Sequence, residues 1–180
     1  MSKMLPKVSN VEEAVTRLRN WVIETPVLES DILNERAGTR VLVKAESLQR
    51  GGSFKIRGAL NHLLQLSPDE CRAGVVAFSS GNHAQGVALA AKWLDIKATV
   101  VMPKDAPKIK MLNTQALGAE IVRTPTEAAW DSPESHIGVA KKIQSEIPNS
   151  HILDQYANPA NPDAHYEGTA QEILDDFDDS

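Results

Sequence analysis

From residue 40 onward, short β-branched apolar runs alternate with longer segments whose apolar positions recur at helical spacing. The predicted strands are residues 41–45, 74–78, 97–102, 120–123 and 150–153, and the predicted helices between them are residues 54–66, 84–94, 106–117 and 133–147. Each helix from residue 84 onward is long enough to return the chain to the start of a neighbouring strand. The pattern therefore predicts an α/β fold, with parallel strands and flanking helices.

The first forty residues predict two helices separated by extended chain. Asn10 is a suitable N-cap for a helix that runs to Trp21, with Glu13 as its capping-box partner. A short helix over residues 32–37 is expected to end at Gly38, because glycine readily adopts the left-handed conformation of a C-cap.

The last two predicted helices differ in their end signals. Ser132 and Pro133 suit the N-cap and the first position of helix 133–147. The final helix, from about Glu167, runs into residues 175–179, whose aspartates oppose the helix macrodipole. A sheet that stops just after a helix also leaves an edge unfinished. We therefore expect the chain to be the N-terminal part of a longer protein.

Composition narrows the class of protein. The 180 residues are 42% hydrophobic, which is enough for a sizeable core. The net charge of −5 argues against nucleic-acid and anionic-membrane partners. The single cysteine, Cys71, fits a reducing compartment. Residues 1–10 hold no signal-peptide-like run, and no stretch is apolar enough to span a membrane, so we expect a cytoplasmic protein.

The first candidate chemical segment is residues 49–58, where Lys55 and Arg57 lie in the first turn of a predicted helix. The positive end of the helix and the Arg57 charge are expected to lower the Lys55 pKa, which favours a nucleophilic amine that forms a Schiff base. The alternative is that both are solvated surface bases. Gly51 and Gly52 favour the functional interpretation, because they let the backbone approach a ligand closely.

The second candidate segment is residues 78–86, in which a strand enters a small polar turn and then a helix. Backbone N–H groups at such a helix N-terminus can bind a carboxylate or phosphate, with Ser79, Ser80 and Asn82 as additional donors. The alternative is an ordinary capped turn, in which His83 is a structural hydrogen-bonding residue.

Other functional classes lack their motifs. His136, His151, His165 and Glu167 have neither an H-E-x-x-H pattern nor zinc-ligand spacing, so no metal site is expected. Neither a Walker motif nor a G-x-G-x-x-G turn after a strand occurs, so the sequence gives little support to nucleotide binding.

The two segments together resemble the threonine/serine dehydratase and serine racemase group of pyridoxal phosphate (PLP) enzymes. The motifs are Gly-Gly-Ser-Phe-Lys-Ile-Arg-Gly-Ala at 51–59 and Phe-Ser-Ser-Gly-Asn-His-Ala-Gln-Gly-Val-Ala at 78–88. From about Ala116 the chain instead resembles cystathionine β-synthase, a neighbour in the same fold-type II family. That enzyme has valine and threonine at the positions of Phe54 and His83, so the dehydratase-like half is taken to set the reaction type.

This resemblance implies the two-domain fold of the tryptophan synthase β type, C-terminally truncated here. Residues 1–73 would belong to a large domain, residues 74–149 to a small inserted α/β domain, and residues 150–180 to an incomplete return to the large domain. The relatives commonly form dimers, which makes a homodimer one expectation, and non-specific association through the unfinished sheet edge is the alternative.

The resemblance also implies roles for individual residues. Lys55 would carry PLP as a Schiff base, Phe54 would pack beside the cofactor, and Asn82 would hydrogen-bond its ring hydroxyl. Ser80 matches the second acid/base of the racemases. The substrate carboxylate would be held by Ser79, Ser80, Gly81, Asn82 and His83.

The implied reaction is conversion of L-threonine or L-serine to a 2-keto acid and ammonia, with neutral Lys55 as the base at Cα. The alternatives are racemisation through Ser80, β-replacement as in cystathionine and cysteine synthases, and a non-catalytic fragment or chimera. The family's glycine-rich phosphate loop and the residue that faces the pyridine nitrogen lie beyond the matched region. The chain alone is therefore expected to bind PLP weakly and to turn over little or no substrate.

Overall fold

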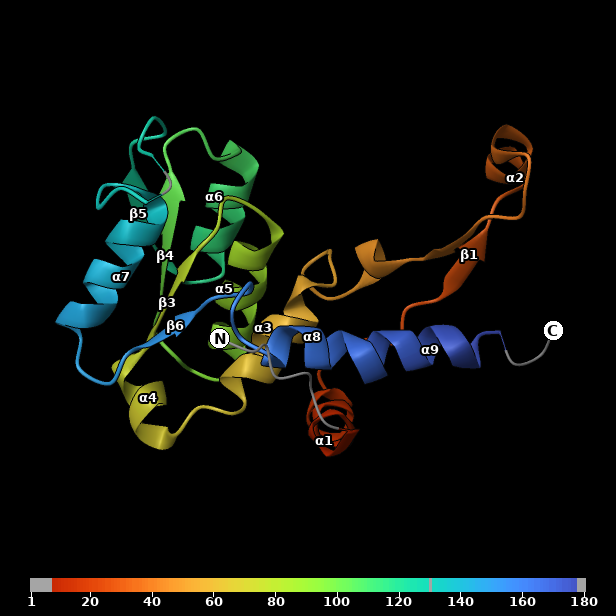
Figure 1. Cartoon of the computed structure of the whole chain (residues 1–180), viewed down its shortest axis with the longest axis horizontal. Coiled ribbons are helices and arrows are strands. Elements are labelled where there is room, and N and C mark those ends of the chain that lie inside the picture. The colour runs from red at the N-terminus through yellow and green to blue at the C-terminus, as the bar shows by residue number, and fades with distance from the viewer. Residues whose placement is uncertain (1–7, 130, 178–180) are drawn as a thin grey trace.

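A four-stranded parallel sheet lies at the centre of the body of the molecule, in a computed structural model that describes residues 8–129 and 131–177 (Figure 1). The strand order is β5-β4-β3-β6, and every neighbouring pair is parallel. The strands are β3 (Val75–Phe78), β4 (Ala98–Pro103), β5 (Glu120–Thr124) and β6 (His151–Leu153). The predicted α/β fold with parallel strands is confirmed.

Helices cover both faces of this sheet, and the side chains of the central strands alternate between two cores. Helices α5 (Asn82–Trp93) and α6 (Lys108–Ala116) lie on one face, where Val75, Ala77 and Val100 are buried. Helix α7 (His136–Glu146) covers the other face, above Val76 and Val101. Burial on both faces explains the continuous apolar runs of β3 and β4.

Helix α3 (Lys55–Leu63) packs directly on α5. A Cβ atom on Gly86 would lie 3.1 Å from the carbonyl carbon and oxygen of Lys55, so only glycine fits this crossing without movement. The short helix α4 (Pro68–Ala73) follows, with a capping box between Ser67 and Glu70. The sequence prediction did not include α4.

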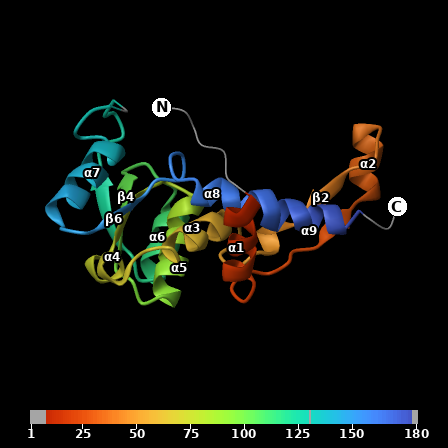
Figure 2. The same cartoon turned by 60° about the horizontal axis from the view of Figure 1, so that its bottom comes forward.

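A second region projects away from the sheet as an arm, defined here as β1 (Val27–Glu29), α2 (Asp31–Ala37) and β2 (Leu42–Lys44) (Figures 1 and 2). The two strands pair antiparallel, so the predicted strand 41–45 exists but does not join the parallel sheet. Helix α2 ends at Gly38 in the left-handed conformation, as predicted, and has no buried residue. The 3-10 turn η1 (Glu46–Leu48) leads back to the body.

Two helical segments lie between the arm and the body. Helix α1 (Val8–Leu18) crosses the π-helical segment η2 (Ala164–Thr169), which continues from α8 (Ala160–Asp163) into α9 (Ala170–Asp175) as one rod (Figure 2). The last helix therefore begins at Ala160, not near Glu167 as predicted, because the π turn lets the helix continue through residues 164–169.

Two predicted N-caps are wrong. Asn10 lies inside α1, and Glu13 pairs with Arg17 one turn later instead of closing a capping box. Helix α7 begins three residues later than predicted, because the hydroxyl of Ser135 accepts the Gly138 N–H at 3.0 Å.

The strand predicted at 150–153 is β6, and it pairs with β3 in the main sheet. The sheet of the predicted inserted domain thus includes residues 151–153 in addition to strands from residues 74–149. The division of the chain into two domains stays a prediction.

Candidate active site

Lys55 is the first residue of α3 and follows a loop that only glycines make easily. Gly51 and Gly52 have φ angles of 78° and 72°, in the left-handed region. Phe54 occupies the N-cap position, and the Lys55 ammonium lies 4.9 Å from the centre of its ring. Burial lowers the pKa of Lys55, so a larger fraction of the amine is neutral than for a lysine on an open surface.

Arg57 lies only two residues further but has a different environment. Its side chain is 1% exposed, and its guanidinium donates to Glu46 at 2.7 and 3.0 Å and to Glu172 at 2.6 and 2.8 Å. Burial disfavours the Arg57 cation, but these hydrogen bonds outweigh burial and raise its pKa. The prediction that Arg57 lowers the Lys55 pKa is therefore wrong in its cause. The alternative of a solvated surface base is also wrong for Arg57.

The turn after β3 leads into α5 at the carboxyl end of the parallel sheet. Gly81 is the N-cap residue of α5, and its N–H donates to the Ser79 hydroxyl at 3.2 Å. Ser80 and Asn82 are exposed, whereas Ser79 is half-buried. A parallel sheet commonly binds ligands at this edge, where the N–H groups of a helix N-terminus face the ligand.

His83 points inward from the same turn and is 4% exposed. Its Nε2 atom lies 3.3 Å from the Leu153 carbonyl oxygen, and its Nδ1 atom has no hydrogen-bond partner among the described residues. Burial, together with the nearby Lys55 charge, lowers the pKa of His83 to about 4. His83 is thus a neutral, buried imidazole at pH 7.

His165 is a neighbour of this site that the sequence does not reveal. The π-helical segment η2 places its ring edge-on to the Phe54 ring, with centroids 5.3 Å apart. Its Nδ1 atom lies 3.0 Å from the Thr169 hydroxyl, and its Nε2 atom is buried without a hydrogen-bond partner in the described structure. Burial lowers the pKa of His165. An extra residue in a helical turn has no recognisable spacing, so no sequence signal identifies this contact.

Lys110, on α6, is a second neighbour that sequence reasoning missed. Its ammonium donates to the Asn82 side-chain oxygen at 2.5 Å and to the Gln85 side-chain oxygen at 2.8 Å. The structure therefore brings Lys55, Phe54, His83 and His165 close together, and it ties Asn82 to α6.

The histidines considered as metal ligands are separate in the structure. Within residues 8–129 and 131–177, no group of three His, Cys, Asp or Glu residues could hold a metal ion. His151 instead contacts His62, with the two Nε2 atoms 2.8 Å apart, and its Nδ1 atom lies 3.2 Å from Glu70. No helix in the same part of the chain is long and apolar enough to cross a membrane.

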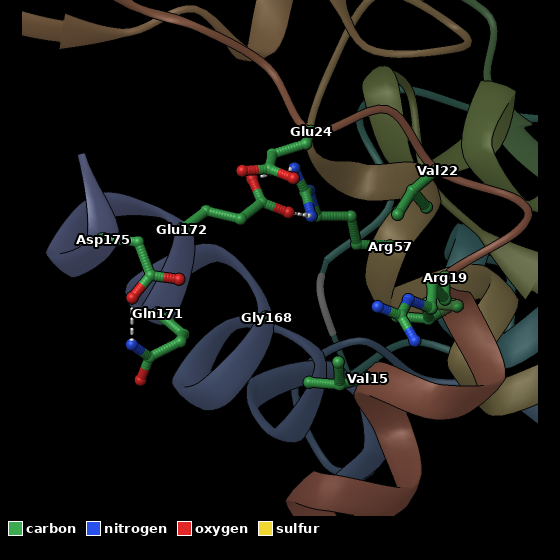
Figure 3. Close-up of a pocket in the computed structure, with 10 residues that line it drawn as sticks. Val15, Arg19, Val22, Glu24, Arg57, Gly168, Gln171, Glu172 and Asp175 are labelled. Carbon is green, nitrogen blue, oxygen red and sulfur yellow. Dashed lines mark hydrogen bonds and ion pairs between the residues drawn. The ribbon is translucent and has the colours of Figure 1, made fainter.

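A cavity of about 280 Å³ lies between α1 and α9 (Figure 3). Val15 and Arg19 line one side of it, and Glu24 lies beside Arg57 and Glu172 on another (Figure 3). The predicted site residues at 54–55 and 79–83 are absent from its lining. The Arg57 guanidinium is already satisfied by carboxylates, so this cavity is separate from the candidate active site.

Comparisons with known proteins agree with this geometry. A family profile described as "Pyridoxal-phosphate dependent enzyme" matches residues 18–180. Cystathionine beta-synthase of Dictyostelium discoideum is 45% identical over 156 residues, which are 84% of this chain and 31% of the relative. L-threo-3-hydroxyaspartate ammonia-lyase of Saccharomyces cerevisiae is 48% identical over 120 residues, which are 67% of this chain and 37% of the relative.

Solved structures show the same fold. Maize serine racemase superimposes with a TM-score of 0.85 at 32% identity, covering 96% of this chain and 50% of the racemase. A threonine deaminase from T.th. gives a TM-score of 0.81 at 36% identity, covering 95% of this chain and 52% of the deaminase. The chain thus spans about a third of these curated relatives and about half of these solved structures. It belongs to the fold-type II family of pyridoxal-phosphate dependent enzymes, and its cofactor is pyridoxal 5'-phosphate.

Proposed function

We propose that the protein contributes the lysine-bearing part of a PLP-dependent ammonia-lyase, which converts L-threonine or L-serine to a 2-keto acid and ammonia. The observation that carries the proposal is Lys55, a half-buried amine of lowered pKa at the start of α3. The family match and the ammonia-lyase relative support the reaction class.

The residues present fit the cofactor. An aromatic ring, Phe54, lies beside the Lys55 amine. Two buried ring nitrogens, His83 Nδ1 and His165 Nε2, lack hydrogen-bond partners among the described residues, and an approaching polar group could satisfy them. Lys55, Phe54 and Asn82 would hold the cofactor, as the family resemblance implies. When bound, PLP supplies an electron sink for the charge that develops at the substrate's Cα.

The chain's own groups supply the remaining chemistry. Ser79, Ser80, Gly81, Asn82 and His83 would bind the substrate carboxylate at the start of α5, with Ser79 acting through its side chain because its N–H already donates to the Val101 carbonyl. The Lys55 amine would take the Cα proton, which requires the neutral form that burial favours. Ser80 is exposed beside this turn and is the group that would return a proton from the opposite side in a racemase.

A visible absorption spectrum after addition of PLP tests the proposal. We expect a band that Lys55→Ala abolishes and that the matched control Lys108→Ala, at an exposed lysine of α6, retains. Borohydride reduction followed by peptide mass analysis should place the adduct on Lys55. A band that survives Lys55→Ala, or an adduct on another lysine, would overturn the assignment.

β-Replacement is a second candidate, favoured by the cystathionine beta-synthase relatives that match 83–86% of the chain. Product analysis separates the two reactions. Ammonia-lyase activity forms a keto acid from L-threonine without a second substrate. β-Replacement from L-serine requires an added thiol and forms a thioether amino acid.

A further inference from the structure

The Lys110 side chain joins α6 to the first two turns of α5. Its ammonium donates to Asn82 Oδ1 at 2.5 Å and to Gln85 Oε1 at 2.8 Å. At the base of the side chain, the Thr114 hydroxyl donates to the Lys110 carbonyl at 2.8 Å, and Thr114 is fully buried. The lysine therefore projects from a fixed turn of α6.

A lysine ammonium has three donors and no acceptor, so it fixes the direction of any carboxamide that it contacts. The Asn82 oxygen must face Lys110, which turns the Asn82 NH₂ group away from α6. Without the lysine, the two orientations of the amide are nearly equal in shape and differ only in their hydrogen bonds. Lys110 thus decides which end of the Asn82 side chain points away from α6.

The charge of Lys110 has an unusual setting. In the described part of the chain its ammonium contacts two neutral carboxamides and forms no ion pair, in contrast to Lys44 and Arg57. A cation at the N-terminal end of α5 also faces the positive pole of the helix, which disfavours it. The two Lys110 hydrogen bonds therefore contribute little to the stability of the fold, but they fix the orientation of the Asn82 and Gln85 amides.

We propose that Lys110 is a positioning residue that holds the Asn82 NH₂ group as a hydrogen-bond donor toward the ring hydroxyl oxygen of PLP. This inference rests on the proposed function, since it assigns Asn82 to the cofactor. Gln85 is held by the same ammonium and keeps the lysine centred between the first and second turns of α5. The positive charge behind the amide also favours the ionised form of the cofactor's hydroxyl.

The test compares Lys110→Met, which removes the ammonium, with Lys110→Arg, which restores a donor. Lys108→Met is the matched control, because Lys108 is exposed on the same helix. We expect Lys110→Met to weaken PLP binding roughly 2- to 10-fold, the value of one hydrogen bond. It should also shift the PLP spectrum from the visible band of the ionised hydroxyl toward the near-ultraviolet band of the neutral form. Lys110→Arg should restore most of both properties, and Lys108→Met should match the unmodified chain.

A measurement without PLP separates this inference from the proposed function. In ¹⁵N-labelled protein, the Asn82 side-chain amide, assigned with Asn82→Asp, should shift in Lys110→Met and keep its position in Lys108→Met. If this shift is seen but no Lys55-dependent PLP band forms, the orienting contact stands and the proposal that this chain by itself carries PLP on Lys55 fails. If PLP binds to Lys55 and Lys110→Met changes neither affinity nor spectrum, the positioning role is wrong.

Discussion

The sheet body and the arm are stabilised in different ways. In the body, β3 is buried at every position, and its apolar side chains supply both cores. In the arm, Leu28 and Val43 are 49% and 43% exposed, and Ile32 on α2 is 66% exposed. Apolar burial therefore holds the body together, whereas the arm offers little apolar surface to the rest of the described chain.

Ion pairs fix the arm to the body where apolar contacts do not. Arg57 of α3 binds Glu46 beside the arm and Glu172 of α9, and Lys44 of β2 binds Glu172 at 2.9 Å. Lys55 begins α3, two residues before Arg57. The body therefore sets the position of α3, while the buried charges set the position of the arm relative to Lys55.

The largest expected effect comes from breaking the ion pairs at the junction. Arg57→Ala leaves Glu46 without its cation and leaves Glu172 paired with Lys44 alone, so the free energy of unfolding should fall by about 3–5 kcal/mol. Urea unfolding measures the loss, and hydrogen exchange should show arm residues 27–44 losing protection before the sheet. The control is Arg40→Ala, which removes an exposed ion pair with Glu29 within the arm and should leave stability unchanged. Equal losses in the two variants would contradict the distinction.

The next largest effect is a pH dependence of the body's stability, which comes from His62. Burial, with the neighbouring His151 and His83, lowers the pKa of His62 to about 4, although Glu70 opposes this shift. The unfolded chain binds a proton at His62 near pH 6.5, before the folded chain does. Stability from this group is therefore complete above pH 6.5 and falls as the pH drops toward 4, by on the order of 3 kcal/mol.

Thermal or urea unfolding between pH 7 and pH 4 measures this loss. His62→Gln should make the pH profile shallower by the share of His62, while His83 and His165, whose pKa values are also lowered, keep the remaining slope. His136→Gln, on the opposite face of the sheet, is the control and should keep the slope. A profile that His62→Gln leaves unchanged would assign the loss to other groups.

The smallest expected effect is a loss of stability from a substitution at the α3–α5 crossing. Gly86→Ala places a methyl group 3.1 Å from the Lys55 carbonyl, so α3 must move by a few tenths of an ångström, at a cost of about 1–3 kcal/mol. Gly168→Ala is the opposite control, because a Cβ there meets nothing within 4 Å and alanine favours a helix. Calorimetry should show a lower melting temperature for the first variant only, together with a weaker Lys55-dependent PLP band.

The body was predictable because its signals are local. Continuous apolar runs such as residues 74–78 predicted buried parallel strands, and the structure confirms them. The close backbone approach to a ligand at Gly51 and Gly52 stays a prediction, although both glycines adopt the left-handed conformation. Helix α4 could also have been predicted, since Ser67, Pro68 and Glu70 form a capping box with proline at the first position. The first residue of α7 could not be predicted, because Ser132 and Ser135 are equally good N-caps by residue type.

The sequence by itself determined the strand and helix order of the body except for α4, the family through its two motifs, and Lys55 as the candidate nucleophile. Only the tertiary structure decided that burial and not Arg57 lowers the Lys55 pKa, and that Arg57 turns toward Glu46 and Glu172. It likewise brought His165 to Phe54 and Lys110 to Asn82. These contacts join residues from 11 to 115 positions apart, and spacing along a chain encodes such contacts only through packing.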